Sequence, residues 1–156
     1  MLTIREDDLS SEPVRALLAF HLANMHSSSP PGHSFALDLI GLKQPAITVW
    51  TVWDGGVLAG VGALKAHGDG TGELKSMRTH PDHLRKGVAA TLLDHIIGEA
   101  RARGYHRLSL ETGVDAPFEA ALALYRKRGF VAGPAFADYE HSEFNQLLHL
   151  DLQPGP

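Results

Sequence analysis

Cysteine is absent from this chain of 156 residues, which excludes disulfide bonds, thiolate metal sites and a cysteine nucleophile. Long apolar runs are also absent, because His, Arg or Gly interrupts each of them, so no segment has the character of a membrane span. The N-terminus, MLTIREDDLSSEP, is acidic and has no apolar core, which does not fit a signal peptide. These absences favour a cytoplasmic protein.

The chain also lacks a long basic run or a basic–aromatic pattern, which argues against a nucleic-acid groove. Its formal net charge is −4 with histidine neutral, and mild acidity tolerates a cationic partner such as an amine. The remaining composition, 44% hydrophobic and 21% charged, is typical of a globular domain. Because no repeat or linker divides the sequence, we expect one domain over residues 1–156.

The first part of the chain predicts a strand followed by two helices. Leu2–Glu6 fits a short strand, and Ser10 or Ser11 can cap a helix that has Pro13 in its first turn. The sequence SSSPPG should end that helix, because it breaks any periodic structure. Phe35–Leu42 fits a second short helix.

Three strands separated by glycine-rich turns come next. β-branched and aromatic residues predict them at Ala46–Trp53, Val57–Lys65 and Glu73–Thr79. The turn sequences DGG and GDGTG between them predict an antiparallel meander.

The second half alternates helices and strands. Apolar residues at a spacing of three and four predict a helix over residues 88–100, which Gly104 ends. Arg107–Thr112 predicts a strand parallel to the third meander strand, because a helix connects the two. One helix and two strands complete the chain: Glu119–Arg128, Phe130–Ala132 and Asn145–Leu152. This order predicts an α+β fold with a mixed, mostly antiparallel sheet and helices on both faces.

The segment LRKGVAA, residues 84–90, has the features of an anion-binding turn. It combines two basic residues with a glycine at a helix start, where backbone N–H groups lack intrahelical partners. Gly87 permits a ligand to approach the backbone closely. The alternative is a plain helix start with two solvated basic residues, although positive charge there is slightly unfavourable without an anion.

This turn resembles motif A of the GNAT superfamily of N-acetyltransferases, Q/R-x-x-G-x-G/A, with Gly87 and Ala89 at the small positions. Leu84 departs from the Gln or Arg of the pattern. Met77–Pro81 resembles the family strand that leads into a V-x-P turn, and Leu124–Phe130 resembles the L-Y-x-x-x-G-F signature. The resemblance covers residues 46–132 and extends to small bacterial members of the family.

The resemblance implies an enzyme, an N-acetyltransferase with acetyl-CoA as cosubstrate and a small or amino-acid-like primary amine as acceptor. Met77 and Thr79 are expected to bind the pantetheine arm as an added strand would. The pyrophosphate is expected on the whole turn: Leu84, Arg85, Lys86, Gly87, Val88, Ala89 and Ala90. A peptide or protein acceptor, and a non-catalytic acyl-CoA sensor, are the alternative functions.

A protonated amine has no lone pair, so the reaction needs a base. The resemblance implies Glu73 in that role. The alternative for Glu73 is an exposed strand carboxylate paired with Lys75, two residues along the same face. The other candidate bases are Glu111, His80 and His106.

The resemblance implies that Tyr125 is the acid that protonates the departing thiolate. The alternative is that Tyr125 has only a structural role, packed under the sheet. Without cysteine, direct transfer in a ternary complex is expected instead of an acetyl-cysteine route.

His80-x-x-His83 lacks a third ligand, so no metal site is expected. The sequence leaves open a homodimer paired through its late strands.

Overall fold

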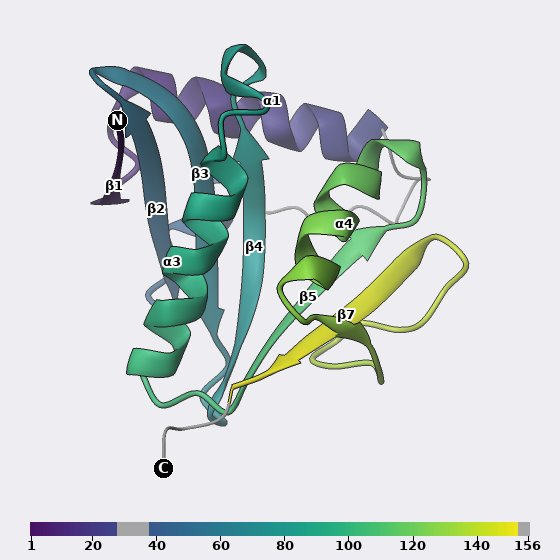
Figure 1. The fold of residues 1–156 in the computed structure, drawn as a ribbon. Helices are drawn as coiled ribbons and strands as arrows, with labels where there is room; N and C mark the ends of the chain where they lie inside the picture. The colour runs from purple at the N-terminus through teal and green to yellow at the C-terminus, as the bar shows by residue number, and fades with distance from the viewer. Residues whose placement is uncertain (28–37, 153–156) are drawn as a thin grey trace.

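The computed structural model describes residues 1–27 and 38–152, which form a seven-stranded sheet in the order β1-β2-β3-β4-β5-β7-β6 (Figure 1). The strands are β1 (Leu2–Asp7), β2 (Ile47–Asp54), β3 (Val57–Ala66), β4 (Thr71–Thr79), β5 (Arg107–Gly113), β6 (Val131–Ala132) and β7 (Asn145–Asp151). The helices are α1 (Glu12–Ser27), α2 (Leu39–Leu42), α3 (Val88–Ala102) and α4 (Glu119–Lys127). Short 3₁₀ turns, Pro81–His83 and Ala116–Phe118, precede α3 and α4.

The α+β fold expected from the sequence is confirmed. β1 to β4 pair antiparallel in sequence order, β4 and β5 are parallel, and β5, β7 and β6 are again antiparallel. The helices lie on both faces of the sheet (Figure 1). Among the described residues, no helix has the length and apolar character that crossing a membrane requires.

Two details at helix starts differ from expectation. α2 begins only at Leu39, because Asp38 is extended and its side chain accepts a hydrogen bond from the Gly41 amide; residues 35–37 of the expected helix lie outside the described residues. Ser11 immediately precedes α1, but its buried hydroxyl has no hydrogen-bond partner among the described residues. The hydroxyl of Ser10 turns back to Asp8 at 2.6 Å, so neither serine side chain caps the helix.

Both faces of the sheet are buried, which explains why the central strands are apolar on both sides. One core lies under α3 and α4, where the stripe predicted from the sequence is almost fully buried: Leu92, Leu93, Ile96, Ile97 and Ala100. The second core lies under α1 and α2 and includes Val14, Leu17, Leu18 and Leu42.

β4 and β5 pair only over Thr71–Glu73 and Arg107–Ser109, and beyond this short contact they diverge (Figure 1). A β-bulge accompanies the divergence, since the register of β4 against β3 shifts there and Ser76 has a φ of 56°. Beyond Glu73, no described strand pairs with the edge of β4 that faces β5. The fold therefore leaves an open strand edge at the centre of its sheet.

Gly113, the last residue of β5, lies close to the Phe118 ring. A Cβ atom added there would lie 2.2 Å from Cε2 of the buried Phe118 ring. Gly113→Ala should therefore lower the free energy of unfolding by about 1–3 kcal/mol through overpacking. Gly98→Ala is the matched control, because no atom lies within 4 Å of its added Cβ, and it should stabilise α3 by about 0.5–1 kcal/mol. Urea unfolding of both variants measures these changes. An unchanged free energy of unfolding for Gly113→Ala would show that the Phe118 ring can move aside.

Candidate active site

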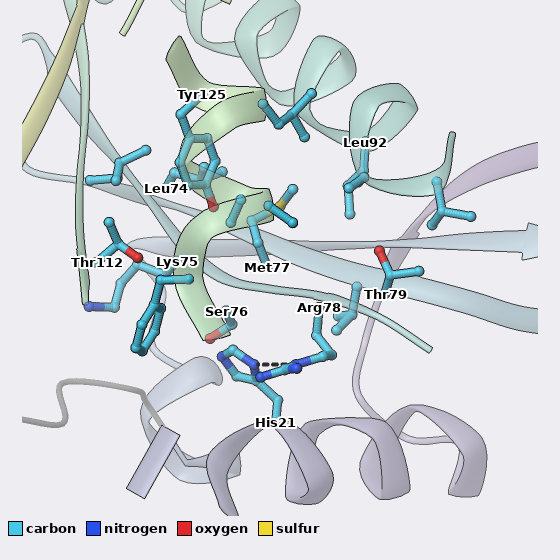
Figure 2. Close-up of a pocket in the computed structure, with 18 of the residues that line it drawn as sticks. His21, Leu74, Lys75, Ser76, Met77, Arg78, Thr79, Leu92, Thr112 and Tyr125 are labelled. Atoms are coloured by element: carbon cyan, nitrogen blue, oxygen red, sulfur yellow. Dashed lines mark hydrogen bonds between the residues drawn. The ribbon is translucent and has the colours of Figure 1, made fainter. Parts of the chain in front are cut away.

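A cavity of about 480 Å³ lies where β4 and β5 diverge. Its walls come from β4, the end of β5, the start of α3, α4, and two α1 residues, His21 and Met25. Figure 2 shows Leu74 and Tyr125 toward α3 and α4, whereas His21 and Arg78 face the side of α1. The predicted site residues therefore meet in one place: Glu73, Met77, Thr79, Tyr125 and all of residues 84–90 except Lys86 line this cavity.

The turn 84–90 presents unpaired backbone N–H groups to the cavity. In α3, the first backbone amide that donates to a backbone carbonyl is that of Thr91, which bonds to the carbonyl oxygen of Gly87 at 2.9 Å. Within the described residues, no amide of residues 84–90 donates to a backbone carbonyl. Arg85 and Gly87 have φ values of 63° and 77°, and left-handed residues so closely spaced produce a concave nest of N–H groups. This turn can hold an anion.

The basic side chains of the turn are not equivalent. Lys86 Nζ lies 3.8 Å from Asp54 Oδ2 and 3.4 Å from His83 Nδ1, so its charge is partly offset inside the protein. Arg85 forms no ion pair with another described residue. Leu84 is 61% exposed and offers no polar side-chain group. An anion here would rely on the backbone amides and Arg85.

Tyr125 projects its hydroxyl from α4 toward β4 (Figure 2). Its ring packs against Phe130 at 5.7 Å between centroids, and the residue is 7% exposed. Burial raises the pKa of Tyr125 to about 12, against the opposing influence of Arg78. The phenol is therefore a hydrogen-bond donor throughout the physiological range.

Glu73 is buried on β4, with 2% of its surface exposed. Its Oε1 lies 3.0 Å from His67 Nε2, and its Oε2 lies 3.2 Å from Lys75 Nζ. The ion pair with Lys75 considered from the sequence is present, but the carboxylate is not exposed. A buried carboxylate with this many partners is held in one orientation.

Tyr139 completes the surroundings of Glu73 and was not among the predicted site residues. It lies between β6 and β7, where its hydroxyl donates to Glu73 Oε2 at 2.5 Å and accepts from Lys75 Nζ at 2.8 Å. Phe136 packs on its ring at 5.0 Å between centroids and also contacts His149. Burial, with the charge of Glu73 nearby, raises the pKa of Tyr139 strongly. The only hint in the sequence is an aromatic residue within a polar loop.

Glu111 reaches the same cavity from β5. Burial raises its pKa to about 7; Asn145 and Lys75 act against this rise, and the charge of Glu73 adds to it. Two carboxyl groups thus share the neighbourhood of one lysine, and Glu111 changes its charge near neutral pH. His80 and His106, the weaker base candidates from the sequence, do not line the cavity.

Arg78 and His21 form a pair on the α1 side that sequence reasoning did not identify. Arg78 Nε donates to His21 Nδ1 at 3.0 Å, shown as the dashed line in Figure 2. The guanidinium also lies over the ring of Phe20, 5.5 Å from its centroid. Burial, followed by the charge of Arg78, lowers the pKa of His21 to about 4, so its Nδ1 lone pair is available to accept. No described carboxylate forms an ion pair with Arg78.

The described residues contain no cluster of three or more side chains suited to a metal ion. His80 Nδ1 instead accepts from the Asp82 amide at 3.1 Å, and the His83 ring packs edge-on against His80. These contacts give His80 and His83 a role in the local structure of the turn before α3.

The raised pKa of Glu111 predicts how stability depends on pH. The folded chain holds a proton between pH 4.5, the ordinary value, and about 7, whereas the unfolded chain has released it. Stability contributed by this group therefore falls as the pH rises through that window. Glu111→Gln cannot ionise, so it should match the parent below pH 4.5 and exceed it above pH 7 by up to about 3 kcal/mol.

Thermal unfolding of both proteins across this pH range measures the difference. Exposed Glu119→Gln is the control for the same change of side chain on the surface, and it should alter the free energy of unfolding by less than about 0.5 kcal/mol. A pH-independent difference for Glu111→Gln would contradict the raised pKa.

Comparison with known proteins gives a consistent assignment. The model of the acetyltransferase (GNAT) family matches residues 14–130. The uncharacterised N-acetyltransferase YedL of Escherichia coli strain K12 is 50% identical over 152 residues, covering 97% of this chain and 96% of that protein. The IAA acetyltransferase of Azospirillum brasilense is 37% identical over 112 residues, covering 70% and 71%. The L-amino acid N-acyltransferase MnaT of E. coli K12 is 39% identical over 88 residues, covering 52% and 49%.

Solved structures show the same fold. A protein of Klebsiella pneumoniae, assigned as an acyl-CoA N-acyltransferase, has a TM-score of 0.82 and 28% identity, covering 98% of this chain and 99% of that one. A GNAT family acetyltransferase of Elizabethkingia anophelis, solved with acetyl-CoA bound, has a TM-score of 0.70 and 19% identity, covering 97% and 98%. The chain therefore belongs to the GNAT family of acetyltransferases, as its sequence motifs predicted.

Proposed function

We propose that this enzyme transfers an acetyl group from acetyl-CoA to the primary amine of a small, amino-acid-like molecule, by direct attack in a ternary complex. One observation carries the proposal: a single cavity joins an anion-binding turn, an open strand edge and a group of buried acid–base residues. Each of these three parts meets one requirement of acetyl transfer to an amine.

The cosubstrate would supply the acetyl thioester, and two parts of the cavity suit its polar groups. The unpaired amides of residues 84–90, with Arg85, suit a pyrophosphate. The open edge of β4 at Met77–Thr79 suits the amide groups of a pantetheine arm, which would pair with it as an added strand does. Leu84, where the family motif has Gln or Arg, offers no polar side chain, so this binding would depend on the backbone amides and Arg85.

Glu73 is the base in this proposal, and Tyr139 is its route to the substrate. Glu73 Oε2 already accepts the Tyr139 hydroxyl hydrogen, so an amine next to Tyr139 can release its proton to the phenol oxygen while Glu73 takes the phenol proton. Lys75, which contacts both groups, stabilises the negative charge of Glu73 until the transfer occurs.

Glu111 is the second candidate for the base. Its pKa of about 7 matches what a general base needs at neutral pH, and it lines the cavity directly. Lys75 and Glu73 both influence it, so the two carboxyl groups are electrostatically linked. Substituting each carboxyl group in turn is needed to decide which of them is the base.

Tyr125 stabilises the departing thiolate by donating a hydrogen bond to it. Its pKa of about 12 is well above that of an ordinary thiol, roughly 8.5, so complete transfer of the phenol proton would be unfavourable. A charge-assisted hydrogen bond still stabilises a thiolate as it forms. This refines the role expected from the sequence, from acid to hydrogen-bond donor.

An amino-acid-like acceptor is consistent with the name of one relative, the L-amino acid N-acyltransferase MnaT, although that similarity covers only about half of each chain. The buried carboxylate of Glu73 and the half-buried carboxyl group of Glu111 favour an ammonium group at this end of the cavity.

Turnover measurements test the proposed roles. Glu73→Gln should lower kcat/KM for the amine by about 10²- to 10⁴-fold, because a base is lost. Tyr125→Phe should lower kcat by about 10- to 100-fold, because the thiolate loses a hydrogen bond. Neither change should alter the Kd of acetyl-CoA more than about twofold, since neither residue lies in the turn that holds the pyrophosphate. Thiol release with a panel of small amines gives the rates, and calorimetry gives the affinity.

Glu111→Gln is the decisive comparison. If it retains most of the turnover while Glu73→Gln loses it, Glu73 is the base. The opposite pattern assigns the base to Glu111. Intact acetyl-CoA binding without thiol release for any amine in the parent protein would replace the proposed enzyme activity with acyl-CoA sensing.

A further inference from the structure

We propose that Arg78 binds the carboxylate of the acceptor, so that the substrates are zwitterionic amino acids and not simple amines or peptide N-termini. This inference rests on the proposed function and names the chemical class of acceptor for the same cavity.

The first support is the availability of the Arg78 guanidinium. Its Nε donates to His21, and no described residue takes an ion pair with the remaining N–H groups. A half-buried guanidinium without an anionic partner among the described residues is costly, because its charge has lost part of its hydration. A carboxylate in the cavity would meet this fork with two parallel hydrogen bonds.

The second support is the way in which Arg78 is fixed. α1 supplies both contacts, the 3.0 Å bond to His21 Nδ1 and the ring of Phe20. A protonated His21 would lose the acceptor lone pair, but its pKa of about 4 keeps the bond intact at neutral pH. Because the side chain is already ordered, a ligand would lose less conformational entropy on binding.

The third support is the separation of charge along the cavity wall. β4 carries Glu73 and Lys75 toward one end and Arg78 toward the other, with Ser76 between them. The Ser76 hydroxyl is buried and has no hydrogen-bond partner among the described residues. Charged groups of both signs therefore line one wall of the cavity, as recognition of a zwitterion, which carries its ammonium and carboxylate on one carbon atom, requires.

The same arrangement disfavours the other acceptor classes. A peptide N-terminus has no carboxylate beside its amine, and it would leave Arg78 buried against a neutral amide. A diamine would place a second positive charge near the guanidinium, which is repulsive. Arg78 would thus select its substrate partly by rejecting others.

Calorimetry on the full chain saturated with CoA tests the inference, with the twenty standard L-amino acids and their C-terminal amides as probes. At least one amino acid should bind, and its amide should bind about 10- to 100-fold more weakly. Arg78→Met should weaken the binding of that amino acid by a similar factor and leave the affinity for its amide unchanged. Arg78→Lys should bind the amino acid with an affinity between those of the parent and Arg78→Met, because lysine keeps the charge but not the planar pair of donors.

Arg103→Met is the matched control. Arg103 pairs with Glu99 and Thr48 and does not line the cavity, so its variant should bind as the parent does. The inference is overturned if acids and amides bind equally, if Arg78→Met weakens both alike, or if no amino acid binds.

These results remain separable from the proposed function. Equal acetylation of acids and amides, measured as thiol release, would keep the acetyltransferase proposal and reject the role of Arg78. Selective binding of acids without thiol release would keep the role of Arg78 and reject acetyl transfer to them.

Discussion

The early separation of β4 from β5 is the constraint on which the rest of this structure depends. The two strands share only three residue pairs, and the bulge at Ser76 turns β4 away from its neighbour. A parallel pair that continued to Thr79 would satisfy its backbone and leave no cavity. Separation instead leaves an unpaired edge and a space that a ligand able to pair with the backbone can fill.

Electrostatics in this space follow from burial. Lys75 forms an ion pair with Glu73 and also acts electrostatically on Glu111, and burial raises the pKa of Glu111 to about 7. Tyr139 adds a hydrogen bond to Glu73 that fixes it without neutralising it. The cavity therefore contains groups that can accept protons, next to a turn whose unpaired backbone amides could bind an anion without relying on side-chain charge alone.

Local sequence patterns predicted the elements of the fold and the parts of the site that lie within one element. The turn at Leu84–Ala90, the strand carrying Glu73 and the helix carrying Tyr125 are each encoded by neighbouring residues. The contacts of Tyr139 with Glu73 and of His21 with Arg78 were not predicted, because they join residues 66 and 57 positions apart. Such contacts follow from the packing of a loop and of α1 onto β4. The protonation of Glu111 was likewise inaccessible, since it depends on burial.

Hydrogen–deuterium exchange with and without acetyl-CoA can locate the bound cosubstrate, because it reports on backbone amides. We expect slower exchange in the segments 77–79 and 85–90 when acetyl-CoA is bound, with exchange in β1 and β6 unchanged. If acetyl-CoA binds and these two segments exchange at the same rate as before, the open edge and the turn are not its site.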